Sequence, residues 1–312
     1  MKKFLINVFI FFTGFFVLDK TLILLRNYSP KTEVDKRLEM IITGKINSNI
    51  LIYGSSRGAR DIMASQIADS LKTTAYNLSF PGSGIDFHEF LLEQTLKNGN
   101  KKPEIVILVV DDPTELLPNS IMHFRLDRLY PLVEYPVIRD QLVERDGKNE
   151  LLSKLFIVSQ LGISNFNITQ KHFKTLDTLL QDGSMPISFK DSKFKGQYIT
   201  NTTYYNIKEE TQTNLKSFLN FIKLCKQNNI KLIIISPPNC YKSTVGFNKR
   251  LKELSENNAS FLQFDSTKAY ANNPDYYFDD VHLQRRGAVI FTNELIEYIK
   301  ANTLLNTTEN KN

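Results

Sequence analysis

Two short polar motifs near opposite ends of the chain carry residue types that could together perform acyl chemistry. One is Gly-Ser-Ser at positions 54–56, directly after the apolar run 50–53. The other is Asp279 with His282 three positions later. In a nucleophilic triad a histidine takes the serine proton, and a carboxylate orients the imidazole and stabilises its charged form. A serine early and an aspartate and histidine late is a chain order that permits a triad, which only geometry defines.

Each motif also has a plain structural explanation. A Gly-Ser-Ser sequence after an apolar run is an ordinary strand-to-helix turn. An aspartate with a nearby histidine is common where a helix begins, and Asp280 offers a second carboxylate beside Asp279. The two motifs therefore predict chemistry only if the fold brings Ser56 and His282 to one place.

The order and spacing of the motifs resemble those of the SGNH, or GDSL-type, hydrolases. Gly-Ser-Ser at 54–56 is similar to that family's Gly-Asp-Ser block, and residues 279–282 are similar to its Asp-x-x-His block. Between them, residues 77–84 stand where the family has its glycine block. The resemblance covers about residues 48–112 and 230–300. It implies that Ser56 is the nucleophile, that His282 is the base, and that Asp279 rather than Asp280 orients the histidine.

The third block of the family is where this chain departs from the pattern. Acyl transfer needs hydrogen-bond donors for the oxyanion, and we expect the backbone N–H groups of Ser56 and Gly82 to supply them. The family adds an asparagine in a Gly-x-Asn-Asp block, whereas residues 110–113 read Val-Asp-Asp-Pro. An ionised carboxylate cannot donate a hydrogen bond. Asn77 and Asn239 are alternative donors, and a catalytically inactive binding or assembly module is the alternative function.

Two further polar residues lie close to these motifs. Arg57 directly follows the predicted nucleophile, and a structural salt bridge to Asp111 or Asp112 is favoured over binding of an anionic substrate. His88 falls on a predicted helix after the glycine block. It is expected to be a surface or packed histidine rather than a member of the site.

Composition excludes several classes of function. The chain has 312 residues, a net charge of +6, 42% hydrophobic and 23% charged residues, which suits one large globular domain or two small ones. Its lysines and arginines are scattered, which predicts a solvated basic surface and no nucleic-acid partner. No zinc-site, phosphate-loop or dinucleotide-binding spacing occurs, so neither a metal nor a cofactor is expected. The two cysteines, Cys225 and Cys240, neither require nor exclude a disulfide.

The N-terminus predicts a membrane anchor. Residues 4–25 are mostly apolar and follow a Lys-Lys start, but they reach the length of about 20 residues needed for a span only by including Asp19 and Lys20. No small-x-small cleavage site is present after them, which favours an uncleaved signal anchor over a signal peptide. Four basic residues between positions 26 and 37 do not favour export of the downstream domain. The family resemblance instead implies a single-pass protein of the bacterial cytoplasmic membrane with its catalytic domain on the periplasmic or extracellular side.

Hydrophobic periodicity predicts the elements that must position the motifs. Ser83 is expected to be the N-cap of a helix that begins at Ile85. Strands alternating with helices imply parallel pairing and a three-layer α/β/α sandwich with a five-stranded, mainly parallel sheet, flavodoxin-like and of the SGNH type. The predicted strands are 49–53, 74–78, 104–110, 231–236 and 261–264, and the predicted helices are 61–72, 85–97, 209–227, 247–255 and 283–300.

The predicted organisation has four parts. Residues 1–25 form the anchor, 26–48 a juxtamembrane linker, 49–302 the SGNH-like domain and 303–312 a disordered tail. The irregular, aromatic-rich stretch 113–206 is too long to be structureless, so we expect an insertion or lid over the carboxyl edge of the sheet.

The expected function comes from the resemblance. Membrane-anchored members that assist D-alanylation of teichoic acids or O-acylation of exopolysaccharides also read Gly-Ser-Ser. The resemblance implies a membrane-anchored acyl esterase or O-acyltransferase that acts on a cell-envelope polysaccharide or polymer through an acyl-Ser56 intermediate. A polytopic membrane O-acyltransferase is the implied protein partner.

Overall fold

The computed structural model describes residues 1–170, 178–188, 203–240, 244–264, 268 and 270–302. The predicted tail 303–312 and the parts 171–177 and 189–202 of the predicted insertion lie outside these residues. The chain forms two compact units, one made of Met1–Ile42 with Arg125–Phe173 and the other of Thr43–Phe124 with Lys174–Asn312. The predicted insertion 113–206 is therefore divided between the two units.

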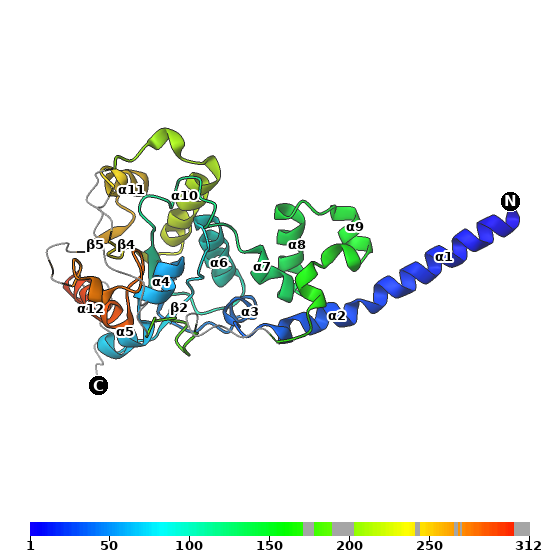
Figure 1. Ribbon diagram of the computed structural model, residues 1–312, viewed down its shortest axis with the longest axis horizontal. Helices are drawn as coiled ribbons and strands as arrows, with labels where there is room; N and C mark the ends of the chain where they lie inside the picture. The colour runs from blue at the N-terminus through cyan, green and yellow to red at the C-terminus, as the bar shows by residue number, and fades with distance from the viewer. Residues whose placement is uncertain (171–177, 189–202, 241–243, 265–267, 269, 303–312) are drawn as a thin grey trace. The chain divides into compact units, whose positions relative to one another are not determined.

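A five-stranded parallel sheet is the centre of the second unit, which we call the α/β unit (Figure 1). Its strand order is β2-β1-β3-β4-β5, the order of a flavodoxin-like sheet. The predicted α/β fold class is confirmed. The strands are β1 Ile50–Gly54, β2 Ala75–Asn77, β3 Ile105–Val109, β4 Lys231–Ser236 and β5 Ser260–Gln263.

Register places the ends of the two central strands side by side. All five residues of β1 and all five of β3 are buried, which is why both read as continuous apolar runs. Gly54 at the end of β1 pairs with Val109 at the end of β3. A Cβ atom at position 54 would lie 2.8 Å from the Cβ of Val109, so glycine is required for this close approach. The turns after β1 and β3 consequently emerge next to each other.

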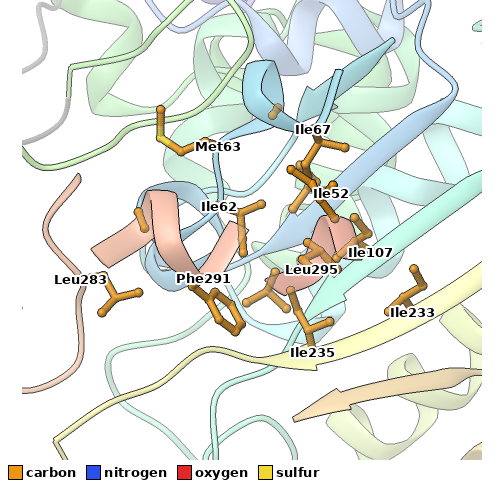
Figure 2. Close-up of a cluster of buried hydrophobic side chains, with 14 of the residues drawn as sticks. Ile52, Ile62, Met63, Ile67, Ile107, Ile233, Ile235, Leu283, Phe291 and Leu295 are labelled. Carbon is orange, nitrogen blue, oxygen red and sulfur yellow. The ribbon is translucent and has the colours of Figure 1, made fainter. Parts of the chain in front are cut away.

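Helices cover both faces of the sheet. Helices α4, α5 and α12 pack on one face and α6 and α10 on the other (Figure 1). On the α12 side, Ile52, Ile107 and Ile235 from three strands meet Phe291 and Leu295 of α12 (Figure 2). On the other side, the Tyr53 hydroxyl donates to Thr95 of α6. The helices are α4 Ser56–Asp61, α5 Ala64–Leu71, α6 Ile85–Lys97, α10 Gln212–Gln227, α11 Phe247–Ser255 and α12 Arg285–Ala301.

Two local predictions are wrong. The predicted helix 61–72 corresponds to α5 but starts too early, because Ile62 and Met63 are extended and bury their side chains in the core, and a further helix, α4, precedes them where none was predicted. The N-cap of α6 is Gly84 rather than Ser83, since the Ser83 hydroxyl bonds elsewhere. The first difference matters most, because it makes Ser56 the first residue of a helix.

The other unit is helical. Its N-terminal part contains one stretch, Lys2–Thr32, that by length and composition is long and apolar enough to cross a membrane. Residues 125–170 pack against this N-terminal part with short helices. The helices of the unit are α1 Lys2–Thr21, α2 Ile23–Tyr28, α3 Arg37–Ile42, α7 Leu126–Leu129, α8 Pro136–Arg145 and α9 Glu150–Leu155, with 3-10 turns η1 Ser29–Thr32, η2 Tyr130–Leu132, η3 Val158–Gln160 and η4 Ile163–Phe166.

Candidate active site

The structure brings Ser56, His282 and Asp279 into contact, and we call these three residues the open array. Ser56 Oγ lies 2.7 Å from His282 Nε2. On the other side of the ring, His282 Nδ1 lies 2.9 Å from Asp279 Oδ2 and 3.0 Å from Oδ1. Asp280, the competing carboxylate, lies next in sequence, but it is Asp279 that holds the His282 ring. The three groups are thus arranged for a serine proton to move to an imidazole held by a carboxylate.

The loop before α12 fixes the carboxylate and the ring together. Asp279 Oδ1 accepts hydrogen bonds from the backbone N–H groups of Val281, at 3.0 Å, and His282, at 2.8 Å. Burial alone would raise the pKa of Asp279, but its hydrogen bonds to the His282 ring and to these two amides outweigh burial and lower the pKa. Asp279 is therefore an ionised acceptor at neutral pH. An ionised acceptor keeps the proton of the imidazole on Nδ1 and leaves Nε2 free to accept.

Helix α4 connects the two distant ends of the chain. Ser56 begins the helix, and Asp61 ends it. Asp61 Oδ1 accepts from the backbone N–H of Leu283 at 2.9 Å, so the residue after His282 is tied to the helix that carries Ser56. Arg60, from the same helix, places Nη1 3.3 Å from His282 Nε2. Sequence analysis missed Asp61, because a carboxylate five residues after Ser56 carries no signal until the C-terminal loop is placed.

Asp61 is fully buried, and its second carboxylate oxygen has no hydrogen-bond partner among the described residues. Burial raises the pKa of Asp61 well above its ordinary range, although Arg57 and the Leu283 amide oppose the change. The residue is consequently a buried acid whose main contact is structural.

The third block forms a network rather than a donor site. The Ser55 hydroxyl donates to Asp111 Oδ2, and Arg57 Nη1 lies 3.6 Å from Asp111 Oδ1. The predicted salt bridge between Arg57 and Asp111 is confirmed. Asp112 Oδ2 accepts from the backbone N–H of Thr244 at 3.0 Å. Asp111 and Asp112 therefore act as acceptors, as the sequence predicts for carboxylates.

A cavity of about 810 Å³ opens beside the open array. Ser56 and His282 lie in its wall, together with Arg57 and both carboxylates of the third block. Both ends of the predicted insertion contribute to the wall, but the described residues 125–170 do not. The apolar and aromatic part of the lining comprises Pro113, Leu117, Ile121, Met122, Tyr204, Tyr205 and Val281.

The predicted oxyanion donors differ in their placement. Ser56 lines the cavity and begins a helix, where the first N–H groups have no partner within the helix. Gly82 is half-buried in the turn after β2 and is not among the described residues that line the cavity. Of the two alternatives, the Asn77 side-chain amide donates to the carbonyls of Gly58 and Ile62, which makes it structural. Asn239 lies in the cavity wall.

A second row of a serine, a histidine and a carboxylic acid lies nearby, and we call Ser83, His88 and Glu115 the sealed array. Ser83 Oγ lies 2.8 Å from His88 Nε2, and His88 Nδ1 lies 3.6 Å from Glu115 Oε1. Exposure of the three residues is 0%, 0% and 1%. Burial lowers the pKa of His88 to about 3 and raises that of Glu115, aided by Asp111, to about 8. Of the two expected alternatives for His88, a surface or a packed histidine, the structure shows the packed one.

No group of three or more His, Cys, Asp or Glu residues that could hold a metal ion occurs in the described ranges. Both cysteines are buried and free. Burial raises the pKa of Cys225 to about 12 and that of Cys240 to about 11, so both thiols are protonated at neutral pH.

The chain has similar proteins among solved structures but not among protein families or curated proteins. No protein-family profile matches the chain, and no curated protein matches it. Among solved structures, the chain is similar to the crystal structure of a psychrotrophic esterase, EstA from Pseudoalteromonas sp., inhibited by monoethylphosphonate. The sequence identity is 11%, the TM-score is 0.41, and the match covers 81% of this chain and 97% of the esterase.

Proposed function

We propose that the protein is an SGNH-like serine acyl esterase or O-acyltransferase. The observation that carries the proposal is the contact of Ser56 Oγ with His282 Nε2 at 2.7 Å, with Asp279 on the far side of the ring at 2.9 Å. These are hydrogen-bond distances for a nucleophile and its base. Ser56 and His282 lie in the wall of a cavity, so an ester could reach them.

In the proposed reaction, Ser56 Oγ attacks the ester carbonyl while its proton passes to His282 Nε2. Asp279 stabilises the imidazolium that forms, and the Ser56 N–H donates to the oxyanion. His282 then gives the proton to the departing alcohol, which leaves an acyl-Ser56 ester. Water or a hydroxyl group of a second substrate attacks this ester with His282 as base, giving hydrolysis or transfer respectively.

For the substrate we propose an acylated polysaccharide or other polymer of the cell envelope. A cavity of about 810 Å³ is within the range of about 300–1,000 Å³ that holds drug-sized ligands, so it has room for an acyl group and part of its carrier. Tyr204 and Tyr205 in the wall combine an aromatic face with a hydroxyl, which suits a sugar ring. A polytopic membrane O-acyltransferase is the proposed partner for supply of the acyl group.

We further propose that α1 anchors the protein in the bacterial cytoplasmic membrane, with the α/β unit on the periplasmic or extracellular side. The support is the length and apolar composition of Lys2–Thr32. A reporter enzyme that is active only outside the cytoplasm, fused after the last residue, tests the orientation. If this reporter is inactive and a reporter that is active only in the cytoplasm is active at the same position, the α/β unit lies on the cytoplasmic side.

The activity is tested with a fluorophosphonate probe and an activated acetyl ester on the full-length protein. We expect covalent labelling located at Ser56 by mass spectrometry, and ester turnover that Ser56→Ala removes. Equal turnover by wild type and Ser56→Ala, with no label on Ser56, would exclude the enzyme.

The second candidate is a catalytically inactive binding or assembly module for an envelope polymer. The observation in its favour is that the third block presents two acceptor carboxylates, Asp111 and Asp112, where an oxyanion donor is expected. This candidate predicts binding of polymer fragments to the cavity with no labelling of Ser56, so robust labelling would rule it out.

A further inference from the structure

Helix α9 of the helical unit exposes its apolar side chains and buries a polar one, which is the opposite of what a helix on the surface of a water-soluble protein does. Leu151, Leu152 and Leu155 lie on one face and are 65%, 47% and 49% exposed. Ser153, on the opposite face, is 6% exposed, and its backbone carbonyl accepts from the Gln160 side chain. Val158, in the following turn, is 44% exposed. Several large apolar side chains on one element in this arrangement mark an interaction surface rather than a scattered surface leucine.

This surface is fixed to the C-terminal end of α1. Asp19 Oδ2 and Oδ1 each accept a hydrogen bond at 2.9 Å, from the backbone N–H groups of Ile157 and Val158 respectively. Lys20 donates to the carbonyl of Leu155. The contacts explain how a mostly apolar helix can carry Asp19, which is only 2% exposed. They also hold the segment from α9 to η3 beside the last turn of α1.

The length of α1 indicates how deep the segment from α9 to η3 would lie in a bilayer that α1 spans. A helix of 20 residues is about 30 Å long at about 1.5 Å per residue, which is the thickness of the hydrocarbon core of a bilayer. A spanning α1 therefore needs its apolar residues up to Leu18 in hydrocarbon, including Phe15 and Phe16. The Phe156 ring packs 5.8 Å from the ring of Phe15 and 6.5 Å from that of Phe16. Phe156 must then lie at the hydrocarbon boundary, and α9 ends one residue before it.

We propose that α9 is a second membrane contact, which lies in the bilayer interface and inserts Leu151, Leu152 and Leu155 among the acyl chains. The occupant of the surface is lipid, because the surface is continuous with the candidate span and is held to it by Asp19 and Lys20. Glu150 and Lys154, which pair with each other and are exposed, flank the leucine face, where charged side chains of an interfacial helix can stay in the headgroup region. The inference rests on the proposed anchoring by α1, but not on the proposed esterase activity.

The natural chain contains no tryptophan, so a single introduced tryptophan reports its own surroundings. We would reconstitute full-length Leu155→Trp, with Leu151→Trp as a second variant, into phosphatidylcholine and phosphatidylglycerol vesicles with and without brominated acyl chains. Phe9→Trp, in the middle of the proposed span α1, is the matched control for a ring in hydrocarbon. Leu219→Trp, at a 40% exposed leucine of α10 in the α/β unit, is the matched surface control. Circular dichroism checks that each variant folds.

The proposal expects blue-shifted emission and bromolipid quenching for Leu155→Trp and Leu151→Trp that approach those of Phe9→Trp, with neither for Leu219→Trp. Quenching of Phe9→Trp alone would overturn the proposal and leave the anchor intact. Blue-shifted emission of Leu155→Trp without quenching would show that the ring packs against protein and not against acyl chains, and would also overturn the proposal. Absence of quenching in Phe9→Trp would contradict both the anchoring by α1 and the proposal that rests on it. Fluorophosphonate labelling of Ser56 in the same vesicles reports the activity separately.

Discussion

The open and sealed arrays each consist of a serine, a histidine and a carboxylic acid in that order, but the hydrogen bond between serine and histidine runs in opposite directions. In the sealed array, Ser83 Oγ donates to the carbonyl of Phe80 at 2.6 Å, so its oxygen is left to accept from His88 Nε2. His88 Nδ1 then has no proton, and it faces a carboxyl group whose pKa of about 8 keeps it protonated. In the open array the carboxylate is ionised, Nδ1 carries the proton, and Nε2 accepts from the serine.

Solvent and backbone contacts make this difference. Asp279 is 32% exposed at its side chain and accepts two backbone N–H groups, and both conditions favour the ionised form. Glu115 is buried beside Asp111 and accepts one backbone N–H at 2.9 Å, which is too little to offset the cost of burying a charge. A serine, a histidine and an acid in a row are therefore insufficient for a nucleophile. The acid must be ionised and the serine must have its proton to give.

The arrays should differ most in the effect on turnover of replacing the serine. Ser56→Ala should lower turnover of an activated acetyl ester by roughly 10⁶ and abolish fluorophosphonate labelling, because the nucleophile is gone. Ser83→Ala should leave turnover nearly unchanged and lower the free energy of unfolding by about 1–3 kcal/mol, since His88 Nε2 loses its buried partner. Comparable losses of turnover in both variants would show that the arrays do not differ in function.

Replacing the acids should sharpen the contrast. Asp279→Asn should lower kcat by roughly 10⁴, because an amide can hold His282 in the wrong tautomer while leaving the geometry intact. Glu115→Gln should keep kcat within a few-fold, since the group is already uncharged in the folded protein at neutral pH. Steady-state kinetics of both purified variants check this. Similar losses of kcat in the two variants would contradict the assignment.

The two acids also predict opposite dependences of stability on pH. The folded protein keeps the Glu115 proton up to about pH 8, whereas the unfolded chain loses it near pH 4.5. Unfolding therefore releases a proton between these values, and stability falls as pH rises through this range. At about 1.4 kcal/mol for each pH unit, the loss is at most about 5 kcal/mol.

Glu115→Gln should remove this loss of stability. Chemical denaturation in detergent at the two ends of the pH range measures the free energy of unfolding of wild type and variant. Asp279 has a lowered pKa and contributes in the opposite sense, so its stabilisation is present above the pKa of the unfolded chain and is lost as pH falls through the folded value. A difference between variant and wild type that stays constant across the range would show that Glu115 is ionised when folded.

The smallest expected effect tests the connection through α4. Asp61→Ala removes the acceptor of the Leu283 N–H and should lower kcat by about tenfold to a hundredfold with little change in KM, because His282 is less well positioned. Asp61→Asn keeps an oxygen acceptor and should restore most of kcat. Asp69→Ala, at an exposed aspartate of α5, is the matched control. Unchanged kcat in Asp61→Ala would show that the loop holds His282 unaided.

Much of the fold could be predicted because local periodicity specifies it. Helices 85–97 and 247–255 and the strand 231–236 begin and end where the pattern predicts. Helix α4 escaped prediction because six residues with Gly58 inside them have no amphipathic period, and their helical form depends on packing against the β2 loop. A Cβ atom at position 58 would lie 2.5 Å from Ser79 Oγ.

The division of the insertion was equally hidden, because it depends on contacts with the N-terminal segment. Asn165, for example, donates to Ser29 across 136 positions of sequence. No periodicity within 113–206 reports such a contact. The same holds for Phe156 against Phe15 and Phe16, which gives α9 its place beside α1.

The sequence by itself determined the parallel sheet, the apolar N-terminal helix and the candidate residues Ser56, Asp279 and His282, because each depends on residue type and short-range pattern. Tertiary structure decided that Ser56 meets His282 across 226 positions, and that Ser83 meets His88 in a place closed to solvent. Sequence could not separate these two serine and histidine pairs, because the ionisation of a carboxyl group depends on water and backbone amides that only the folded chain arranges around it.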